Sequence, residues 1–391
     1  MTNLIYDKTI FVIDTLTIAF IVSIITKGNP VRCIFESVEG RTTDKALRLL
    51  KNFSYKCINI KEAKDYKTPD PNFLGFDQNN IFTSLKKLKE FRRKIDSIYK
   101  EEKGVTYVGP VTSAIMQSLK CNRENIRYIH HGVGDYCWHY RTKHEDVSNF
   151  TVLRSLRHKI GNLIRLLVKY YVRLPNSLYA GFFSSKGYSL YNFNDADVQW
   201  VNYEDFVSPE IKKGLKEIQT IVDTHKCVLF CPFHSGFTRE GVNQDARIYD
   251  DFNIKILEQF LAKDEIVLFK YHYACYKANR HFTNDLEGIV KERTGNTCLD
   301  ITKMIPDEIG GALLPVEVLF SLTNLNKLIS AMSAALFNLE SEKITKCFCI
   351  DFCGEKEVAE KFKKSSQEAI DKLLKSSNRY NSSYHIYDYK D

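Results

Sequence analysis

Short apolar segments separated by polar stretches with helical spacing recur along most of the chain. Residues 9–13 (TIFVI) predict a buried strand, residues 16–26 a helix capped by Asp14 or Thr15, and residues 31–36 (VRCIFE) a second strand. A strand, a helix and a strand in such close succession mark the start of a parallel α/β sheet. The apolar run through the helix contains Asp14 and is shorter than the roughly 20 residues that span a bilayer, so no membrane span is predicted there.

The alternation of strands and helices continues through the first half of the chain. Strands are predicted at 57–60, 105–108 and 126–129, and helices at 84–99 and 113–119. The helix at 84–99 is strongly basic and contains Lys86, Lys87, Lys89, Arg92, Arg93 and Lys94. Because α/β folds bind ligands in loops after the carboxyl ends of parallel strands, the loop after 126–129 is the first candidate site.

Residues 140–205 interrupt this rhythm and are interpreted as a basic helical insertion in the first domain. The segment 152–174 is amphipathic and basic, and Pro175 ends it. One interpretation is a solvated helix face packed on the domain. The other is a contact with a membrane surface or an anionic acceptor, because basic amphipathic helices bind anionic lipid.

A second α/β series starts near residue 220. Its predicted strands lie at 226–231, 265–270, 298–301, 327–331 and 348–352, and its helices at 250–263, 314–322 and 355–375. Two similar halves joined near 206–225 predict an α/β protein of two Rossmann-like domains, 1–218 and 219–391, that face a central cleft.

Composition narrows the function classes. With 391 residues the chain is long enough for two domains, and its 44% hydrophobic and 27% charged residues exclude a collagen-like or disordered protein. The net charge of +8 is a mild basic excess that fits a phosphorylated substrate, a membrane surface or a nucleic acid. The 11 cysteines are scattered and odd in number, which favours a reducing cytoplasm. Cys347, Cys349 and Cys353 are interpreted as part of a buried strand and not as a metal site.

Several common catalytic motifs are absent from the sequence. It contains no GxxxxGKS or GxxxxGKT, no GxGxxG after the first strand, no GxSxG and no HExxH. These absences argue against phosphate-loop ATPases, dinucleotide oxidoreductases, serine hydrolases of the α/β type and the common zinc proteases. No RNA- or DNA-binding motif is recognisable, so no nucleic-acid partner is expected.

The loop from His130 to Tyr136 can supply a general base. His130 and His131 carry imidazoles, a type of side chain that can take a proton at neutral pH, and Asp135 is the carboxylate alternative. Gly132 and Gly134 would let the backbone approach a sugar or phosphate closely. Two other interpretations stay open: histidines that only satisfy a turn, and a metal site. The metal site would use His130, His131, Cys137 and His139.

Three residues of the second half have chemistry suited to a nucleotide. His272 follows a predicted strand, where it could donate a hydrogen bond or a proton to a phosphate leaving group. Ser333 begins a predicted helix after a strand, where a hydroxyl and backbone N–H groups suit an anion, although an ordinary helix cap explains it equally well. Glu317 at a helix start could hold the two hydroxyls of a ribose, or it could simply complement the helix dipole.

The order of these motifs resembles that of bacterial sialyltransferases of the GT-B fold, which include lipooligosaccharide sialyltransferases and capsule polysialyltransferases. Four segments carry the resemblance: Ile129–Tyr136, Lys270–Tyr273, Leu314–Glu317 and Ser330–Ala334. Three departures stand out. His130 and His131 replace the two acids of the first motif, Tyr273 replaces a proline, and Ala334 replaces a second serine.

The resemblance implies a glycosyltransferase that moves sialic acid, or a related keto sugar, from a CMP-sugar to a glycan of a surface polysaccharide or lipooligosaccharide. It implies direct displacement, with His130, His131 or Asp135 as the base and His272 assisting the departing phosphate. It implies no metal and no cofactor beyond the CMP-sugar substrate. The nucleotide-sugar site is assigned to Lys270, Pro315, Glu317, Ser330 and Ser333, together with His234, Ser235 and Gly236.

The expected localisation is cytoplasmic, with peripheral attachment to the cytoplasmic face of the inner membrane. There the basic segments would contact an anionic glycan or lipid. Two alternatives remain open at this point. One is a GT-B glycosyltransferase with another nucleotide sugar. The other is a non-catalytic protein that binds anionic glycans, which predicts a steep salt dependence and no turnover.

Overall fold

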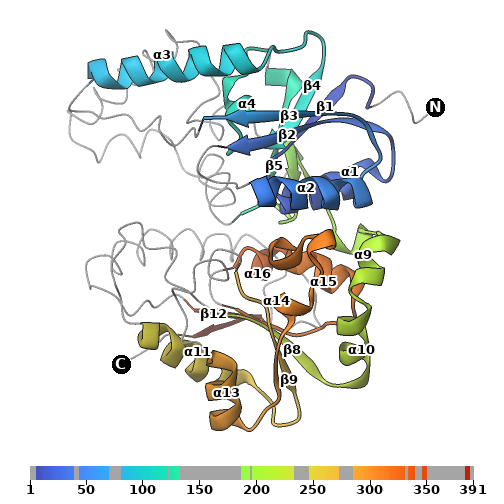
Figure 1. Ribbon diagram of the computed structural model, residues 1–391, viewed down its shortest axis with the longest axis vertical. Coiled ribbons are helices and arrows are strands. Elements are labelled where there is room, and N and C mark those ends of the chain that lie inside the picture. Colours follow the sequence, from blue (N-terminus) through green and yellow to red (C-terminus); the bar gives the residue numbers. More distant parts are fainter. Residues whose placement is uncertain are drawn as a thin grey trace. The chain divides into compact units, whose positions relative to one another are not determined.

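The chain folds into two compact units, Met1–Val201 and Asn202–Asp391, each built around its own parallel sheet (Figure 1). The computed structural model describes residues 6–38, 44–69, 81–121, 123–132, 186–193, 196–232, 246–272, 285–330, 333–339, 346–349 and 384–387. The predicted helices at 152–174 and 355–375 therefore lie outside the described residues.

The division between the units lies earlier in the chain than the boundary at 218 expected from the sequence. The short 3-10 turn Tyr203–Asp205 packs on α15 (Val316–Leu322) of the second unit. Ser321 of that helix donates its hydroxyl to the carbonyl oxygen of Phe206 at 3.1 Å. These contacts attach the segment after Val201 to the second unit.

The first unit contains a seven-stranded parallel sheet in the order β3-β2-β1-β4-β5-β6-β7. The strand order reverses between β1 and β4, where Phe11 lies opposite Val108. A reversal of this kind is the switch point at which doubly wound sheets bind ligands. The strands are β1 (Thr9–Ile13), β2 (Val31–Val38), β3 (Ile60–Thr68), β4 (Thr106–Pro110), β5 (Ile126–His130), β6 (Gly187–Ser189) and β7 (Val198–Trp200).

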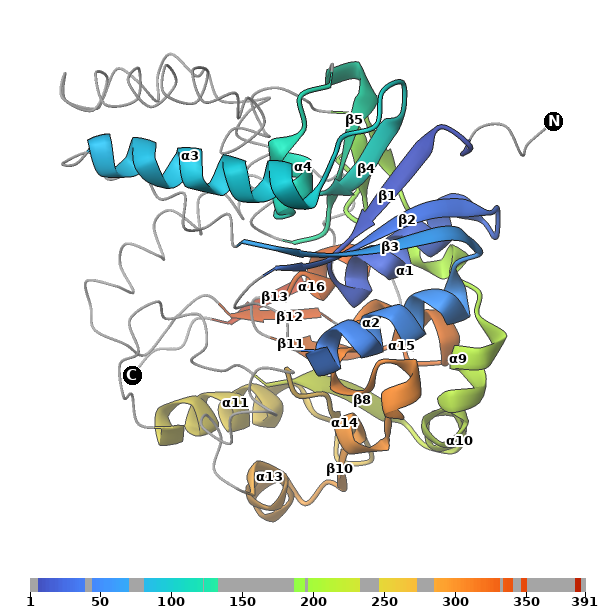
Figure 2. The same cartoon turned by 45° about the horizontal axis from the view of Figure 1, so that its top comes forward.

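Helices cover both faces of this sheet. α1 (Leu16–Thr26) and α2 (Asp44–Cys57) lie together on one face, and α3 (Ile81–Ile98) and α4 (Ala114–Ser118) on the other (Figures 1 and 2). The predicted limits of α1 are confirmed. Its cap is Thr15, whose hydroxyl accepts from the Ile18 amide at 3.3 Å.

The strand predicted at 57–60 was wrong. Cys57 is the last residue of α2, which the sequence analysis missed, and the strand is Ile60–Thr68. β3 lies at the edge of the sheet, and most of its side chains are exposed or half-buried. An edge strand with this much polar surface lacks the apolar run by which buried strands are recognised.

The second unit contains a four-stranded parallel sheet in the order β10-β9-β8-β11. Counted within each unit, this is the same third-second-first-fourth order as at the start of the first sheet, so the prediction of an α/β fold with two Rossmann-like units is confirmed. The strands are β8 (Cys227–Cys231), β9 (Ile266–Phe269), β10 (Cys298–Asp300) and β11 (Leu328–Ser330), and β12 (Lys346–Cys349) and β13 (Tyr384–Tyr387) form a separate parallel pair.

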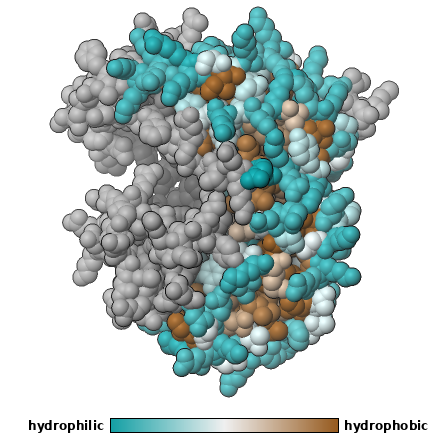
Figure 3. Space-filling model, in the orientation of Figure 1, coloured by the Kyte–Doolittle hydropathy of each residue, from teal (hydrophilic) through white to brown (hydrophobic). Residues whose placement is uncertain are grey.

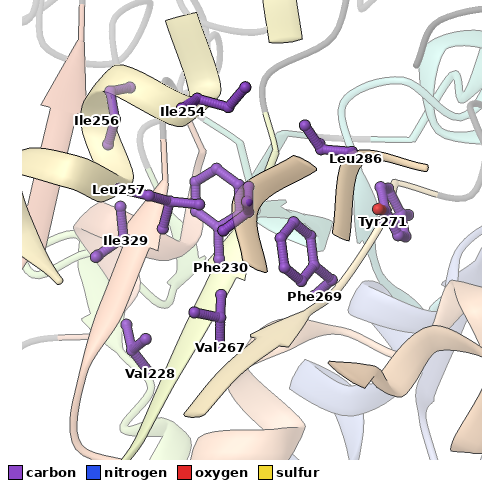
Figure 4. Packing of buried hydrophobic residues seen from close by; sticks show 11 residues of the cluster. Val228, Phe230, Ile254, Ile256, Leu257, Val267, Phe269, Tyr271, Leu286 and Ile329 are labelled. Atoms are coloured by element: carbon purple, nitrogen blue, oxygen red, sulfur yellow. The ribbon is translucent and has the colours of Figure 1, made fainter. Parts of the chain in front are cut away.

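Alternate side chains of the second sheet build its main core. Val228 and Phe230 of β8 and Phe269 of β9 point to the same side, where Phe230 meets Phe269 edge-on at 5.4 Å between ring centroids (Figure 4). Period-two alternation of this kind is what a sheet face imposes. α11 (Ala246–Phe260) and α13 (Leu286–Thr294) cover this face, and the remaining helices are α9 (Pro209–Gly214), α10 (Lys216–Thr224), α14 (Ile301–Met304) and α16 (Ala335–Asn338).

The described residues contain neither a membrane-spanning helix nor a metal-binding cluster. Among them, no helix is both long and apolar enough to cross a membrane. Nor do they include a cluster of three or more His, Cys, Asp or Glu side chains that could hold a metal. Cys347 and Cys349 lie on β12, in agreement with the strand interpretation, and Cys353 lies outside the described part of the chain.

Candidate functional site

The second unit gathers polar side chains at the carboxyl ends of its strands. Cys231 ends β8, Lys270 directly follows β9, and Ser330 ends β11. Ser330 lies opposite Cys231 in the register of the two strands. Since the strand order reverses between β8 and β11, these residues lie at the switch point of the second sheet.

Lys270 is a buried cation at this edge. Its side chain is 5% exposed, and its ammonium donates to the carbonyl oxygen of Ala312 at 2.7 Å. Burial lowers the pKa of Lys270 to about 8, although the Asp300 carboxylate opposes the shift. A lysine ammonium has three donors, so the bond to Ala312 leaves this group able to bind an anion as well.

His272 lies two residues beyond Lys270, and its side chain reaches solvent. The chain packed around the imidazole, and secondarily the Lys270 ammonium, lower the pKa of His272 to about 4. At neutral pH this imidazole is therefore uncharged, with one N–H to donate. The neighbouring Tyr271 is fixed by its amide, which donates to the Thr302 hydroxyl at 2.8 Å, and by stacking on Phe269.

Glu317 lies in the first turn of α15, directly after Pro315 and Val316. It is 5% exposed, and its Oε1 accepts from the amide of Asn338 at 2.7 Å. Asn338 is 2% exposed and holds this carboxylate in place. Asn338 was not predicted from the sequence, because a lone asparagine at the end of a short helix has no local pattern that distinguishes it.

Cys231 lies within electrostatic range of both Lys270 and Glu317. Burial raises the pKa of its thiol to about 12, the Lys270 ammonium opposes that shift, and the Glu317 carboxylate adds to it. Both charges therefore act on one thiol at the end of β8. Lys270 and Glu317, which are 47 residues apart in sequence, therefore lie around the same switch point.

The two serines of the last motif differ in surroundings. Ser330 is 1% exposed, whereas Ser333 is half-buried. We expected Ser333 to begin a helix, but α16 starts at Ala335, whose amide donates to the Ser333 hydroxyl at 3.3 Å. The serine therefore precedes the helix and binds its first amide.

In the first unit, the candidate base loop begins as expected at the end of a strand. His130 ends β5, is 5% exposed, and meets Phe193 edge-on at 6.0 Å between ring centroids. His131 and Gly132 follow and are half-buried. Of the two histidines, His131 is the less buried. Asp135, Gly134, His234, Ser235 and Gly236, and with them Cys137, His139 and Tyr273, lie outside the described residues.

The first unit also has two carboxylates that the sequence analysis did not assign to a site. Asp14 directly follows β1 and is 7% exposed, and Glu36 lies near the end of β2 and is fully buried. Each is a charged residue at the carboxyl end of an apolar strand. That position was the available signal, but Asp14 was interpreted as a helix cap and Glu36 only as the end of a strand.

Comparison with known proteins places the chain beside solved enzymes of low sequence identity. No protein-family model matches it, and no curated protein matches its sequence. It is similar to the crystal structure of an alpha/beta-galactoside alpha-2,3-sialyltransferase from the luminous marine bacterium Photobacterium phosphoreum, with 11% identity over 97% of this chain and 98% of that one and a TM-score of 0.48.

Two further solved structures are similar over most of their length. One is the E. coli ADP-heptose LPS heptosyltransferase II, with 9% identity, coverage of 88% of this chain and 84% of that one, and a TM-score of 0.34. The other is the wall teichoic acid polymerase TagF, with 12% identity, coverage of 95% and 84%, and a TM-score of 0.35. These similarities assign no donor, acceptor or site residue to this chain.

Proposed function

We propose that the protein is a GT-B glycosyltransferase that binds a CMP-sugar in its second unit and a glycan acceptor in its first. The observation that carries the proposal is the grouping of Lys270, Glu317 and Ser330 around Cys231 at the switch point of the second sheet. A cation, a carboxylate and a hydroxyl at that edge suit the phosphate and the ribose of a nucleotide.

The proposed donor is CMP-sialic acid or a related CMP-linked keto sugar. Glu317, held by Asn338, accepts hydrogen bonds from the ribose hydroxyls. The Lys270 ammonium and the Ser333 hydroxyl bind the phosphate. This division of roles follows from charge, because the carboxylate would repel the phosphate and the ammonium attracts it.

The proposed reaction is a direct displacement at the anomeric carbon. The acceptor oxygen forms a bond to this carbon as the bond from the carbon to the phosphate oxygen breaks, and CMP leaves. The acceptor proton passes to a base in the loop after β5. Of the described candidates, His131 is preferred over His130 because it is less buried, and Asp135 remains the carboxylate alternative. The step uses no metal or cofactor, since Lys270 and His272 stabilise the departing phosphate.

The direct test of this function is CMP release from CMP-sialic acid by the purified full chain. We expect release only when a lactose-type or sialylated glycan acceptor is present. UDP- and GDP-sugars serve as the control donors. Turnover of a UDP- or GDP-sugar with no use of CMP-sialic acid would replace the donor in the proposal. Salt-dependent binding of an anionic glycan, with no turnover of any nucleotide sugar, would favour the non-catalytic alternative instead.

A basic surface on α3 supports peripheral attachment to an anionic membrane. Phe91 and Ile95 of this helix are buried, and its exposed side chains include Lys86, Lys87, Lys89, Arg93 and Lys94, which form part of a hydrophilic surface (Figure 3). Arg92 does not belong to it, although the sequence analysis grouped it with the others. Its guanidinium turns inward to the carbonyl of Ser118 and to Asp96.

We expect vesicle binding to depend on this surface. Changing Lys86, Lys87 and Lys89 to Gln should weaken sedimentation with phosphatidylglycerol vesicles about tenfold or more, because each basic residue near an anionic bilayer contributes about 1 kcal/mol. The matched control changes Lys212, Lys213 and Lys216, three exposed lysines of the second unit, to Gln. Equal loss in both variants, or binding to neutral phosphatidylcholine vesicles, would rule out a specific role for α3.

A further inference from the structure

Glu36 has an unusual set of hydrogen bonds for a buried carboxylate. It is fully buried, and its Oε1 accepts from the Thr68 hydroxyl at 2.6 Å, the Ala114 amide at 2.9 Å and the Ile115 amide at 3.3 Å. Its Oε2 accepts from the Ser113 hydroxyl. A buried charge is tolerated only when it is bonded in this way, and removing its partners is costly.

These donors connect Glu36 to two other elements. Thr68 ends β3, whereas Ser113, Ala114 and Ile115 form the start of α4 (Figure 2). The Ser113 oxygen in turn accepts from the Met116 amide at 3.0 Å. The first three amides of α4 are therefore bound by Glu36 and Ser113 together, and Glu36 fixes where the chain turns after β4.

That turn lies at the switch point of the first sheet. β4 pairs with β1 on one side and β5 on the other, so the turn lies between the residues that follow those two strands, Asp14 and His131. Within the turn, Thr112 donates its hydroxyl to Asp14 Oδ2 at 3.1 Å. The carboxyl edge at a switch point is where a doubly wound sheet binds its ligand.

We propose that Glu36 is a positioning residue of the acceptor side. It holds the turn after β4, and through that turn keeps Thr112 against Asp14 at the edge where the acceptor binds. The inference rests on the proposed transferase function for its link to the acceptor. The holding of the turn follows from the hydrogen bonds alone.

The charge state of Glu36 provides a readout that a purely structural role lacks. Burial raises the pKa of Glu36 to about 7, and the Asp14 carboxylate at the end of β1 adds to this, while the hydrogen bonds from Ser113, Thr68 and the Ile115 amide oppose it. The groups of β3 and α4 that face the Glu36 carboxylate are hydroxyls and amides. Only the carboxylate accepts all four donors, so the full network forms above neutral pH and is lost as pH falls through about 7.

The test compares Glu36→Gln with Ser113→Ala and with the double variant. The glutamine keeps a carbonyl for three donors but turns an N–H₂ group toward Ser113, so it imitates the protonated acid. We expect each single variant to raise the acceptor KM about tenfold, the double variant to add little more, and CMP affinity to change by less than about twofold. In the wild type, KM should rise as pH falls from 8 to 6, whereas in Glu36→Gln it should stay high at both values.

The control is Glu62→Gln, which removes a surface carboxylate of the same unit that pairs with Arg32 and Lys64. It should leave the acceptor KM unchanged. Hydrogen exchange of the Met116 amide, which donates to the Ser113 oxygen, gives an independent readout, expected to be about tenfold faster in Glu36→Gln at pH 8 because Ser113 loses its acceptor. An unchanged KM in an active enzyme, or unchanged exchange, overturns the inference. Absence of sugar transfer by the wild type refutes the proposed function instead, and the exchange rates then still decide whether Glu36 holds the turn.

Discussion

Replacing His272 with Ala is expected to lower the rate of acceptor-dependent CMP release by about 10²–10³-fold. Losing one preorganised hydrogen-bond donor to a developing oxyanion typically has an effect of this size. CMP affinity should change by much less, because the bond from the imidazole strengthens as the phosphate departs and the charge on its oxygen grows. Single-turnover CMP release and a CMP titration separate the two effects.

The low pKa of His272 makes the nature of this assistance testable. Burial, and secondarily the Lys270 ammonium, lower the pKa of His272 to about 4, so before ligand binds the imidazole is uncharged at neutral pH and is suited to donate an N–H. We therefore expect His272→Asn, which keeps an N–H donor, to retain more activity than His272→Ala. We also expect no loss of rate between pH 5.5 and 8 that depends on His272.

His225→Ala is the matched control for His272. This histidine is exposed at the end of α10 in the same unit, and its loss should leave the rate unchanged. Equal activity of His272→Ala and wild type would remove His272 from the mechanism. A rate that falls with a pKa near neutrality in the wild type but not in His272→Asn would instead make it a general acid.

The strands that are apolar on both faces were predicted accurately from the sequence. β1, β5, β8 and β9 were predicted to within one or two residues, because a central parallel strand is an unbroken apolar run. β3 was misplaced because edge strands carry polar residues. The division at Val201 was missed because attachment of the next segment depends on the contact of Ser321 with Phe206, which no local pattern reveals.

The site was predictable only as isolated motifs. His272, Glu317 and Ser333 were chosen for their chemistry and order, but their partners come from distant sequence. Asn338 lies 21 residues after Glu317, and the Ser113 bond to Glu36 spans 77 residues. Such pairs arise from the crossover connections of the fold, so neither spacing nor composition predicts them. Burial was equally hidden, since His130 and His131 are adjacent in sequence yet only His130 is almost fully enclosed.

Replacing Glu317 with Gln is expected to weaken CMP binding about 100-fold. A carboxylate that accepts from two ribose hydroxyls makes two charge-assisted hydrogen bonds, each with a net contribution of about 1.5–3 kcal/mol. Losing part of each bond weakens the free energy of CMP binding by roughly 3 kcal/mol. Each 1.4 kcal/mol corresponds to a factor of ten in affinity. Isothermal titration of the full chain with CMP measures this change directly.

Ligand analogues show whether Glu317 meets the ribose. The wild type should bind CMP far more tightly than 2′-deoxy-CMP, and Glu317→Gln should bind the two with similar affinity, because the group that distinguishes them is altered. Asn338→Ala should weaken the same discrimination by releasing the carboxylate from the 2.7 Å bond that orients it. The control Glu217→Gln alters an exposed carboxylate of α10 and should keep both affinities. If Glu317→Gln still discriminates between CMP and 2′-deoxy-CMP, the ribose binds elsewhere. An unchanged melting transition shows that the variant is folded.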